Sequence, residues 1–182
     1  VYRIHEPPTR ESTEGLRKLL SRVGHGLPKR RSLKPRDLQR LLDQVRGRPE
    51  GALISRVVLR SLSKARYDTR NLSHFGLASP AYLHFTSPIR RYPDLVVHRE
   101  VVQSLILGRE DTAGDLGALQ SIAEHSSLRE KAAAEAERAS VDLKKVAFME
   151  GHLGEEFTGQ ISGVAAYGFF VTLDTYFVDG LV

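Results

Sequence analysis

The chain has 182 residues, of which 41% are hydrophobic and 27% charged, and it contains no cysteine. This length allows one or two domains with a buried core, and the composition excludes disorder throughout. Without cysteine there are no disulfides or thiolate metal sites, and no apolar run approaches the ~20 residues of a membrane span. We therefore expect a cytoplasmic protein with no membrane partner. The opening Val1–His5 is not a signal peptide and suggests a chain cut from a longer one.

The net charge of +5 is concentrated in one segment. Residues 16–48 contain eleven lysines and arginines against two aspartates, which gives this segment a local charge of +9. Such a cluster attracts a polyanion, although solvated helix faces would explain each residue equally well. After Lys145 the sequence has no Lys or Arg, so the C-terminal segment must bind any nucleic acid without cationic side chains.

The first third of the chain predicts a strand followed by three amphipathic helices. Residues 1–5 alternate as a strand end does. A helix capped by Thr9 runs to about Val23, a second begins at Pro35, and a third covers about residues 50–64. Three such helices also allow a helix-turn-helix DNA-binding regulator as an interpretation, although the exposed face of the third helix looks like ordinary solvated surface.

The middle of the chain predicts irregular and extended segments followed by two helices. Residues 67–73 are polar and irregular, and residues 74–78 and 81–86 are expected to be extended. One helix is expected from Ser87 toward Leu107, and a long one at about residues 118–150. Helices of this length beside aromatic-rich strands predict an α+β fold whose first half is missing.

The residues around Ser87 carry the clearest chemical signal. Ser87-Pro88 is a helix-start signature, and Arg90 and Arg91 follow it. Backbone N–H groups at a helix start favour an anion, and a guanidinium offers a fixed fork of donors to a phosphate. We predict a phosphate site here. The alternative is a capped helix with two solvated arginines, or a structural pairing with Asp94.

The segment His84-Phe-Thr-Ser-Pro-Ile-Arg-Arg-Tyr-Pro-Asp-Leu95, preceded by His74-Phe-Gly-Leu-Ala78, resembles the ribonuclease II/ribonuclease R family late in its catalytic domain. The resemblance extends more loosely from Val1 to about Glu150. It implies a 3′→5′ exoribonuclease that hydrolyses single-stranded RNA processively to nucleoside monophosphates, with Mg²⁺ held by an aspartate cluster in the earlier half of that domain. This chain has no such cluster. We therefore expect the Mg²⁺ ligands in the missing N-terminal part of the catalytic domain, and no activity from this chain alone.

The resemblance also implies roles for single residues. Arg90 matches an arginine that contacts the phosphate at the scissile end and is needed for activity, whereas Arg91 would hold the structure or a second phosphate. Glu137 matches a catalytic-site glutamate near the terminal nucleotides, although the acidic residue usual after that segment is replaced by Ala139-Ser140. The residues expected to line or support the RNA channel are Tyr82, His84 and Ser87.

Residues 151–182 predict a second type of domain. Residues 157–164 and 168–173 read as two strands, and residues 180–182 could begin a third. This segment resembles the start of the OB-fold RNA-binding domain named after ribosomal protein S-one, which implies that Tyr167 and Phe170 stack RNA bases. Stacking is worth ~1–3 kcal/mol per base and needs no cations. Alternatively, these aromatics belong to a barrel core.

The predicted architecture is therefore an α+β chain with two parts. Residues 1–150 would be the helix-rich C-terminal half of an RNB catalytic domain, and residues 151–182 a partial OB-fold β-barrel, because such a barrel needs about five strands. A non-catalytic RNA-binding or adaptor protein that keeps the RNB fold is the alternative. The two differ in whether an aspartate cluster precedes Val1.

Overall fold

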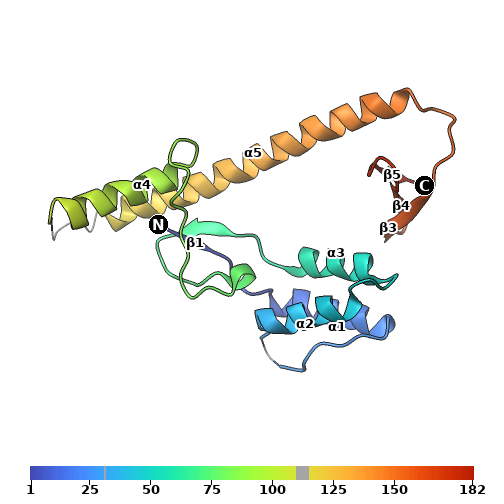
Figure 1. Cartoon of the computed structure of the whole chain (residues 1–182), viewed down its shortest axis with the longest axis horizontal. Coiled ribbons are helices and arrows are strands. Elements are labelled where there is room, and N and C mark those ends of the chain that lie inside the picture. The colour runs from blue at the N-terminus through green and yellow to red at the C-terminus, as the bar shows by residue number, and fades with distance from the viewer. Residues whose placement is uncertain (31, 110–114) are drawn as a thin grey trace. The chain divides into compact units, whose positions relative to one another are not determined.

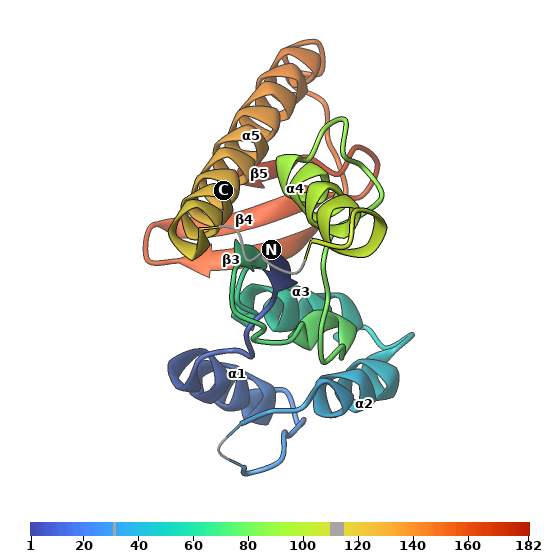
Figure 2. The same cartoon turned by 90° about the vertical axis from the view of Figure 1, so that its left-hand side faces the viewer.

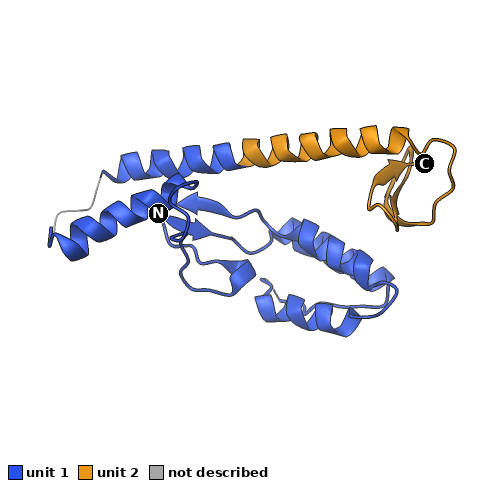
Figure 3. Cartoon of the chain, turned by 45° about the horizontal axis from the view of Figure 1, so that its top comes forward, with its two compact units in different colours: residues 1–130 blue, residues 131–182 orange. Residues whose placement is uncertain are grey.

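The computed structural model describes residues 1–30, 32–109 and 115–182 (Figure 1). Arg31, one of the basic residues of segment 16–48, lies outside the described residues. The chain divides into two compact units, Val1–Glu130 and Lys131–Val182 (Figure 3). Helices and short antiparallel sheets together make an α+β fold, which confirms the predicted fold class.

The first unit combines a two-stranded sheet with helices. Three of these helices lie between the two strands in the sequence, and the others follow the second strand. Its described elements are β1 (Tyr2–Ile4), α1 (Arg10–Arg22), α2 (Pro35–Val45), α3 (Gly51–Ser61), β2 (Arg66–Asp68), the 3₁₀ helix η1 (Phe75–Leu77), α4 (Tyr92–Val101), the π-helix η2 (Val102–Ile106) and the first part of α5 (Leu116–Glu150). The N-terminal strand and the long final helix, both predicted, are confirmed.

The three predicted helices α1, α2 and α3 are confirmed (Figure 2). They share one hydrophobic core. Thr9 caps α1 by accepting a hydrogen bond from the Ser12 backbone N–H at 3.1 Å. Pro35 occupies the first turn of α2, where a missing N–H costs nothing. The core residues are Leu16, Leu20, Leu33, Leu38, Leu41, Val45, Ile54, Val58 and Phe75. Each such side chain stabilises the fold by about 1.5–3 kcal/mol, so the helical spacing of leucines decides this part of the structure.

The small sheet was not predicted in full. Strand β2 pairs antiparallel with β1, with Tyr2 opposite Asp68 and Ile4 opposite Arg66, although residues 67–73 were expected to be irregular. The expectation of extended structure at residues 74–78 is also wrong, because the His74 ring accepts from the Leu77 N–H at 3.2 Å and closes the turn of η1. Residues 81–86 form no strand in the structure.

Helix α4 begins at Tyr92 rather than at Ser87, which corrects the predicted start. The Ser87 carbonyl accepts from the N–H groups of Arg90 at 3.2 Å and Arg91 at 3.0 Å, so these residues form a separate turn. Pro93, in the first turn of α4, fixes the new start because its ring favours helical φ and needs no hydrogen bond there. Ser87-Pro88 is therefore the start of a turn and not of the helix.

The second unit contains the rest of α5 and a three-stranded antiparallel sheet. Strands β3 (Gly159–Ala165), β4 (Gly168–Leu173) and β5 (Asp179–Leu181) lie in that order, which confirms the strands predicted there. The end of α5 packs against the sheet's connecting loop through a cluster of aromatic rings: Phe148, His152, Phe157 and Tyr176. The OB-barrel assignment and the boundary at residue 150 stay predictions.

No helix within the described ranges combines the length and apolarity that a membrane span requires.

Candidate functional site

The turn from Ser87 to Arg91 is attached at both ends to one carboxylate. Asp94 is fully buried, and its Oδ2 accepts from the Ser87 backbone N–H at 2.8 Å. The same oxygen accepts from Arg91 Nε at 3.2 Å and from Arg91 Nη2 at 2.8 Å. Hydrogen bonds to ionised groups are about twice as strong as neutral ones, so this clasp fixes the turn. We call Ser87, Arg91 and Asp94 the Asp94 clasp.

The clasp keeps Asp94 ionised. Burial acts to raise the pKa of the Asp94 carboxyl, but the Ser87 N–H and the hydrogen bonds and charge of Arg91 outweigh burial and leave the pKa below its ordinary value. Arg91, whose side chain is 22% exposed, thus has a structural partner, as one of its two expected roles requires.

Arg90 lies on the turn that the clasp fixes, and its side chain is exposed. Among the residues that the structure describes, no hydrogen bond or ion pair engages its guanidinium. The predicted position of Arg90 in the first turn of a helix is wrong, because α4 begins two residues later. The helix N-terminus therefore does not carry the predicted phosphate site, and what the structure offers at this position is an exposed guanidinium on a fixed turn.

Tyr82 and His84 lie in a cluster of rings that the sequence did not reveal in full. His74 and Tyr82 meet edge-to-face at 5.2 Å between ring centroids, Tyr82 and His84 at 5.7 Å, and Tyr67 and His84 at 5.6 Å. His5 adds a fifth ring, 5.1 Å from His74. We call these five residues the His–Tyr cluster. Tyr82 is 36% exposed, so part of its ring remains open to a ligand.

Two histidines of this cluster, His74 and His84, have pKa values below the ordinary histidine value. Burial lowers the pKa of His74, with His5 as the next cause, and burial followed by the Arg91 charge lowers the pKa of His84. Tyr67 Oη and His84 Nδ1 form a hydrogen bond of 2.9 Å. Aromatic rings that orient one another in this way offer faces and edges against which a further flat ring can pack.

The cluster is supported from β1, which sequence reasoning missed. The Arg3 guanidinium lies 4.7 Å from the centre of the Tyr67 ring and makes two hydrogen bonds to Glu130, of 2.6 and 2.9 Å. The Gly76 N–H donates to His5 Nδ1 at 2.8 Å, and a Cβ at Gly76 would lie 2.8 Å from that same nitrogen. These contacts join residues about 60 to 130 positions apart, and no local pattern could have indicated them.

The remaining predicted residues belong to the second unit. Glu137 is an exposed residue of α5. Tyr167 occupies the turn between β3 and β4 and is 74% exposed, whereas Phe170 is half-buried on β4 and packs over Gly163, where a Cβ would lie 3.5 Å from the ring. Tyr167 is thus open to a ligand, and Phe170 is partly structural.

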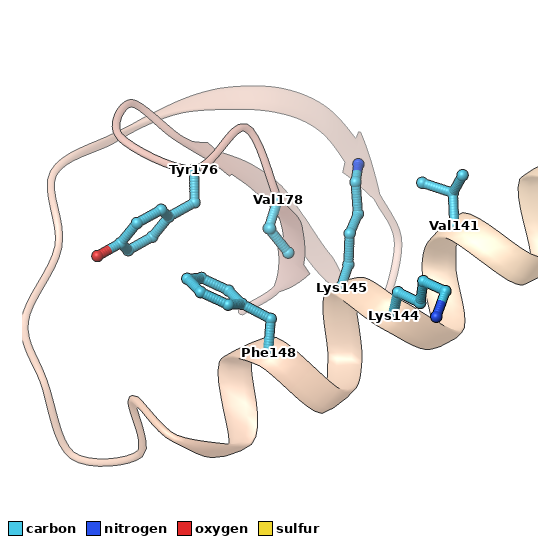
Figure 4. A pocket seen from close by; sticks show the side chains of 6 residues that line it. All are labelled: Val141, Lys144, Lys145, Phe148, Tyr176 and Val178. Carbon is cyan, nitrogen blue, oxygen red and sulfur yellow. The ribbon is translucent and has the colours of Figure 1, made fainter.

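The second unit also has a pocket of about 290 Å³ that sequence analysis did not anticipate (Figure 4). The rings of Phe148 and Tyr176 meet there at 5.1 Å, and the Lys145 ammonium donates to the Phe177 carbonyl at 3.3 Å. The lining residues are Val141, Lys144, Lys145, Phe148, Tyr176 and Val178. The pocket is mainly apolar with ammonium groups beside it.

Within residues 1–30, 32–109 and 115–182, no three His, Asp or Glu side chains come together as a metal site would require. The described residues therefore offer no preformed group of three or more such ligands for a metal ion.

Comparison with known proteins decides the family. The family model described as "RNB domain" matches residues 1–106. The chain belongs to the RNB family. The resemblance seen in the sequence is thereby confirmed.

Curated relatives match this RNB chain over its whole length. Ribonuclease R of Aquifex aeolicus is 42% identical over 182 residues, and ribonuclease R of Escherichia coli is 40% identical over 193 residues. The chain covers 26% and 24% of these two proteins, so it spans about a quarter of the length of the curated relatives it matches.

Solved structures agree with the family. The apo form of Mycoplasma genitalium RNase R matches 99% of the RNB chain with a TM-score of 0.91 at 27% identity, and the chain covers 29% of it. The same enzyme in complex with ribose-methylated single-stranded RNA matches with a TM-score of 0.89, likewise at 27% identity, over 99% of this chain and 29% of that one. Yeast Ssd1, described as a pseudonuclease, shares the fold with a TM-score of 0.80 at 21% identity, over 100% of this chain and 23% of its own.

Proposed function

We propose that this RNB chain is part of a 3′→5′ exoribonuclease that hydrolyses single-stranded RNA processively to nucleoside monophosphates. Its similarity to ribonuclease R over the whole chain supports the reaction class. The observation that carries the proposal is the Arg90 guanidinium, exposed on a turn whose two ends are bound to buried Asp94.

In this proposal Arg90 binds the phosphate at the scissile end of the RNA. A guanidinium presents several N–H donors in a fixed plane, which matches the oxygens of a phosphate. Because the turn is fixed before RNA arrives, the cation needs little reorganisation as negative charge develops on the phosphate. Arg90 would therefore contribute mainly to turnover.

The other residues would hold the strand in place. Tyr82 and His84 would contact a base near the 3′ end, with Ser87 and Arg91 supporting the turn. In the second unit, Glu137 would contact the terminal nucleotides, and Tyr167 and Phe170 would stack bases as part of an OB-type domain.

The metal would come from elsewhere in the protein. The described residues bring no three acidic or histidine side chains together, and the resemblance to the family implies an aspartate cluster earlier in the catalytic domain. The Mg²⁺ ligands would therefore lie outside this chain, in the N-terminal part of that domain. The chain alone would then bind RNA without cleaving it.

The test is Arg90→Ala in the intact enzyme, assayed on a labelled single-stranded oligoribonucleotide. Turnover should fall by about 10²–10³-fold, as for the loss of one preorganised donor, while the Kd for RNA changes by about threefold or less. Arg99→Ala, the removal of another exposed arginine from α4, is the matched control and should leave both unchanged.

Unchanged turnover in Arg90→Ala would refute the assigned role. If the intact wild-type protein bound RNA but released no mononucleotides with Mg²⁺ present, the non-catalytic RNA-binding alternative would be correct instead.

A further inference from the structure

The Arg90 guanidinium has no hydrogen-bond or ion-pair partner among the described residues. Its position must therefore be fixed through the backbone of the turn that carries it. We propose that Asp94 is the positioning residue for Arg90, because its buried carboxylate binds the residues on either side of Arg90 and fixes the segment between them. This inference rests on the proposed phosphate role of Arg90.

The two adjacent arginines differ in their hydrogen bonds, because Arg91 binds Asp94 and Arg90 does not. Arg91 gives two of its five N–H donors to Asp94 Oδ2, at 2.8 and 3.2 Å, and is thereby bound within the fold. The Ser87 N–H gives the third, at 2.8 Å. Arg90 lies between these attachment points, and its own backbone N–H donates to the Ser87 carbonyl at 3.2 Å. The backbone of the turn is thus fixed, and it presents the exposed Arg90 side chain, whose guanidinium has no partner within the described residues.

Stability alone does not explain a carboxylate at this place. Asp94 is fully buried, and its Oδ1 has no hydrogen-bond partner among the described residues. A buried ion with one unpaired oxygen carries a desolvation cost that a well-packed apolar residue would avoid. What the carboxylate provides is a single acceptor that binds a backbone N–H and a guanidinium fork together. That combination fixes geometry, which is what a catalytic cation requires.

Pro88 adds to this constraint. Its ring restricts φ inside the turn, and Pro93 does the same at the start of α4. Asp94 follows Pro93 directly, so the clasp and both prolines restrict the same short segment.

The principal test is Asp94→Asn in the intact enzyme. The amide oxygen can still accept from the Ser87 N–H, but a neutral amide cannot hold the Arg91 fork as a carboxylate does. Turnover should fall by about tenfold to a hundredfold, as expected for a displaced catalytic group, with the Kd for single-stranded RNA changed by about threefold or less. Asp43→Asn, at an exposed aspartate of α2 paired with Arg46, is the matched control and should leave turnover unchanged.

A double-mutant cycle with Arg90→Ala separates positioning from general damage. If Asp94 acts through Arg90, adding Asp94→Asn to Arg90→Ala should lower turnover by about twofold or less. An equal loss from Asp94→Asn in both backgrounds would show a merely structural role and overturn the inference. No loss at all from Asp94→Asn would overturn it as well.

Two further outcomes are distinguishable. If Arg90→Ala itself leaves turnover unchanged, the proposed phosphate role of Arg90 fails, and this inference falls with it. If Asp94→Asn does not fold, Arg91→Lys takes its place: it keeps the charge but loses the fork. A loss of turnover from Arg91→Lys that disappears in the Arg90→Ala background supports the inference, and a loss that persists there contradicts it.

Discussion

Arg3 and Glu130 are 127 residues apart in the sequence and form a two-pronged ion pair with N–O distances of 2.6 and 2.9 Å. The same Arg3 side chain, 12% exposed, covers the Tyr67 ring. This pair attaches the first part of α5 to β1, next to Tyr67 of the His–Tyr cluster. The ends of the first unit are therefore connected next to the His–Tyr cluster.

Arg3→Ala should lower the free energy of unfolding by about 1–2 kcal/mol, because it removes a paired fork and a cation–π contact from a largely covered site. Equilibrium urea unfolding measures this change. Arg10→Ala breaks the exposed Arg10–Glu14 pair on α1 and serves as control, with no measurable change expected. Equal effects of the two substitutions would contradict a special role for Arg3.

Gly76→Ala and Gly15→Ala should have opposite effects. At Gly76 the new Cβ would lie 2.8 Å from His5 Nδ1, so the cluster must shift, at a cost of about 1–3 kcal/mol in unfolding free energy. At Gly15, inside α1, nothing lies within 4 Å, and alanine should stabilise the helix by about 0.5–1 kcal/mol. Thermal unfolding of both variants checks the signs, and stabilisation by Gly76→Ala would show that the close approach is unimportant.

Tyr167→Ala and Phe170→Ala should separate RNA binding from stability. Tyr167 is exposed in its turn, so its removal should leave the melting temperature unchanged and weaken binding of a single-stranded oligoribonucleotide to the intact enzyme by roughly five- to a hundredfold. Phe170 packs over Gly163, so Phe170→Ala should lower the melting temperature as well. Fluorescence anisotropy and calorimetry give the two readouts. Unaltered affinity in Tyr167→Ala would remove this residue from the RNA site.

Stability should fall as the pH drops below about 6.5, the ordinary histidine pKa. Since burial lowers the pKa values of His74 and His84 in the folded chain, the unfolded chain binds more protons in this range. Their contribution is therefore complete above pH ~6.5 and is lost as the pH falls through the folded-state values. Unfolding free energies at pH 7.5 and 5.5 should differ less in His74→Gln/His84→Gln than in the wild type. The other histidines are the same in both proteins, so an unchanged difference would rule out these two as the source.

Local sequence patterns were sufficient for α1 and α2, and they single out Arg90, whose role stays a prediction. Leucines at helical spacing and the Thr9 cap place α1 and α2 almost to the residue, and the Ser-Pro-Ile-Arg segment indicates Arg90. The start of α4 was missed because two prolines, Pro88 and Pro93, each mark a possible helix start there. The helix begins next to Pro93, because the Ser87 N–H donates to Asp94 and Ser87 belongs to a separate turn.

Strand β2 and the His–Tyr cluster could not be predicted for a different reason. Arg66–Asp68 becomes a strand only because β1 supplies a partner more than 60 residues away, and its Tyr67 then meets His84. The ring contacts depend on which distant segments pair with each other, and local sequence patterns do not contain that information.

The uneven distribution of cations along the chain has a consequence for how each end would hold RNA. Side chains of residues 16–48 would displace counterions from the phosphates, so their attraction should weaken steeply as salt is added. The strands β3, β4 and β5 have no Lys or Arg, so contacts made there through Tyr167 would release few ions and persist at high ionic strength. Raising the salt concentration should therefore release the basic end of the chain from RNA before the aromatic end.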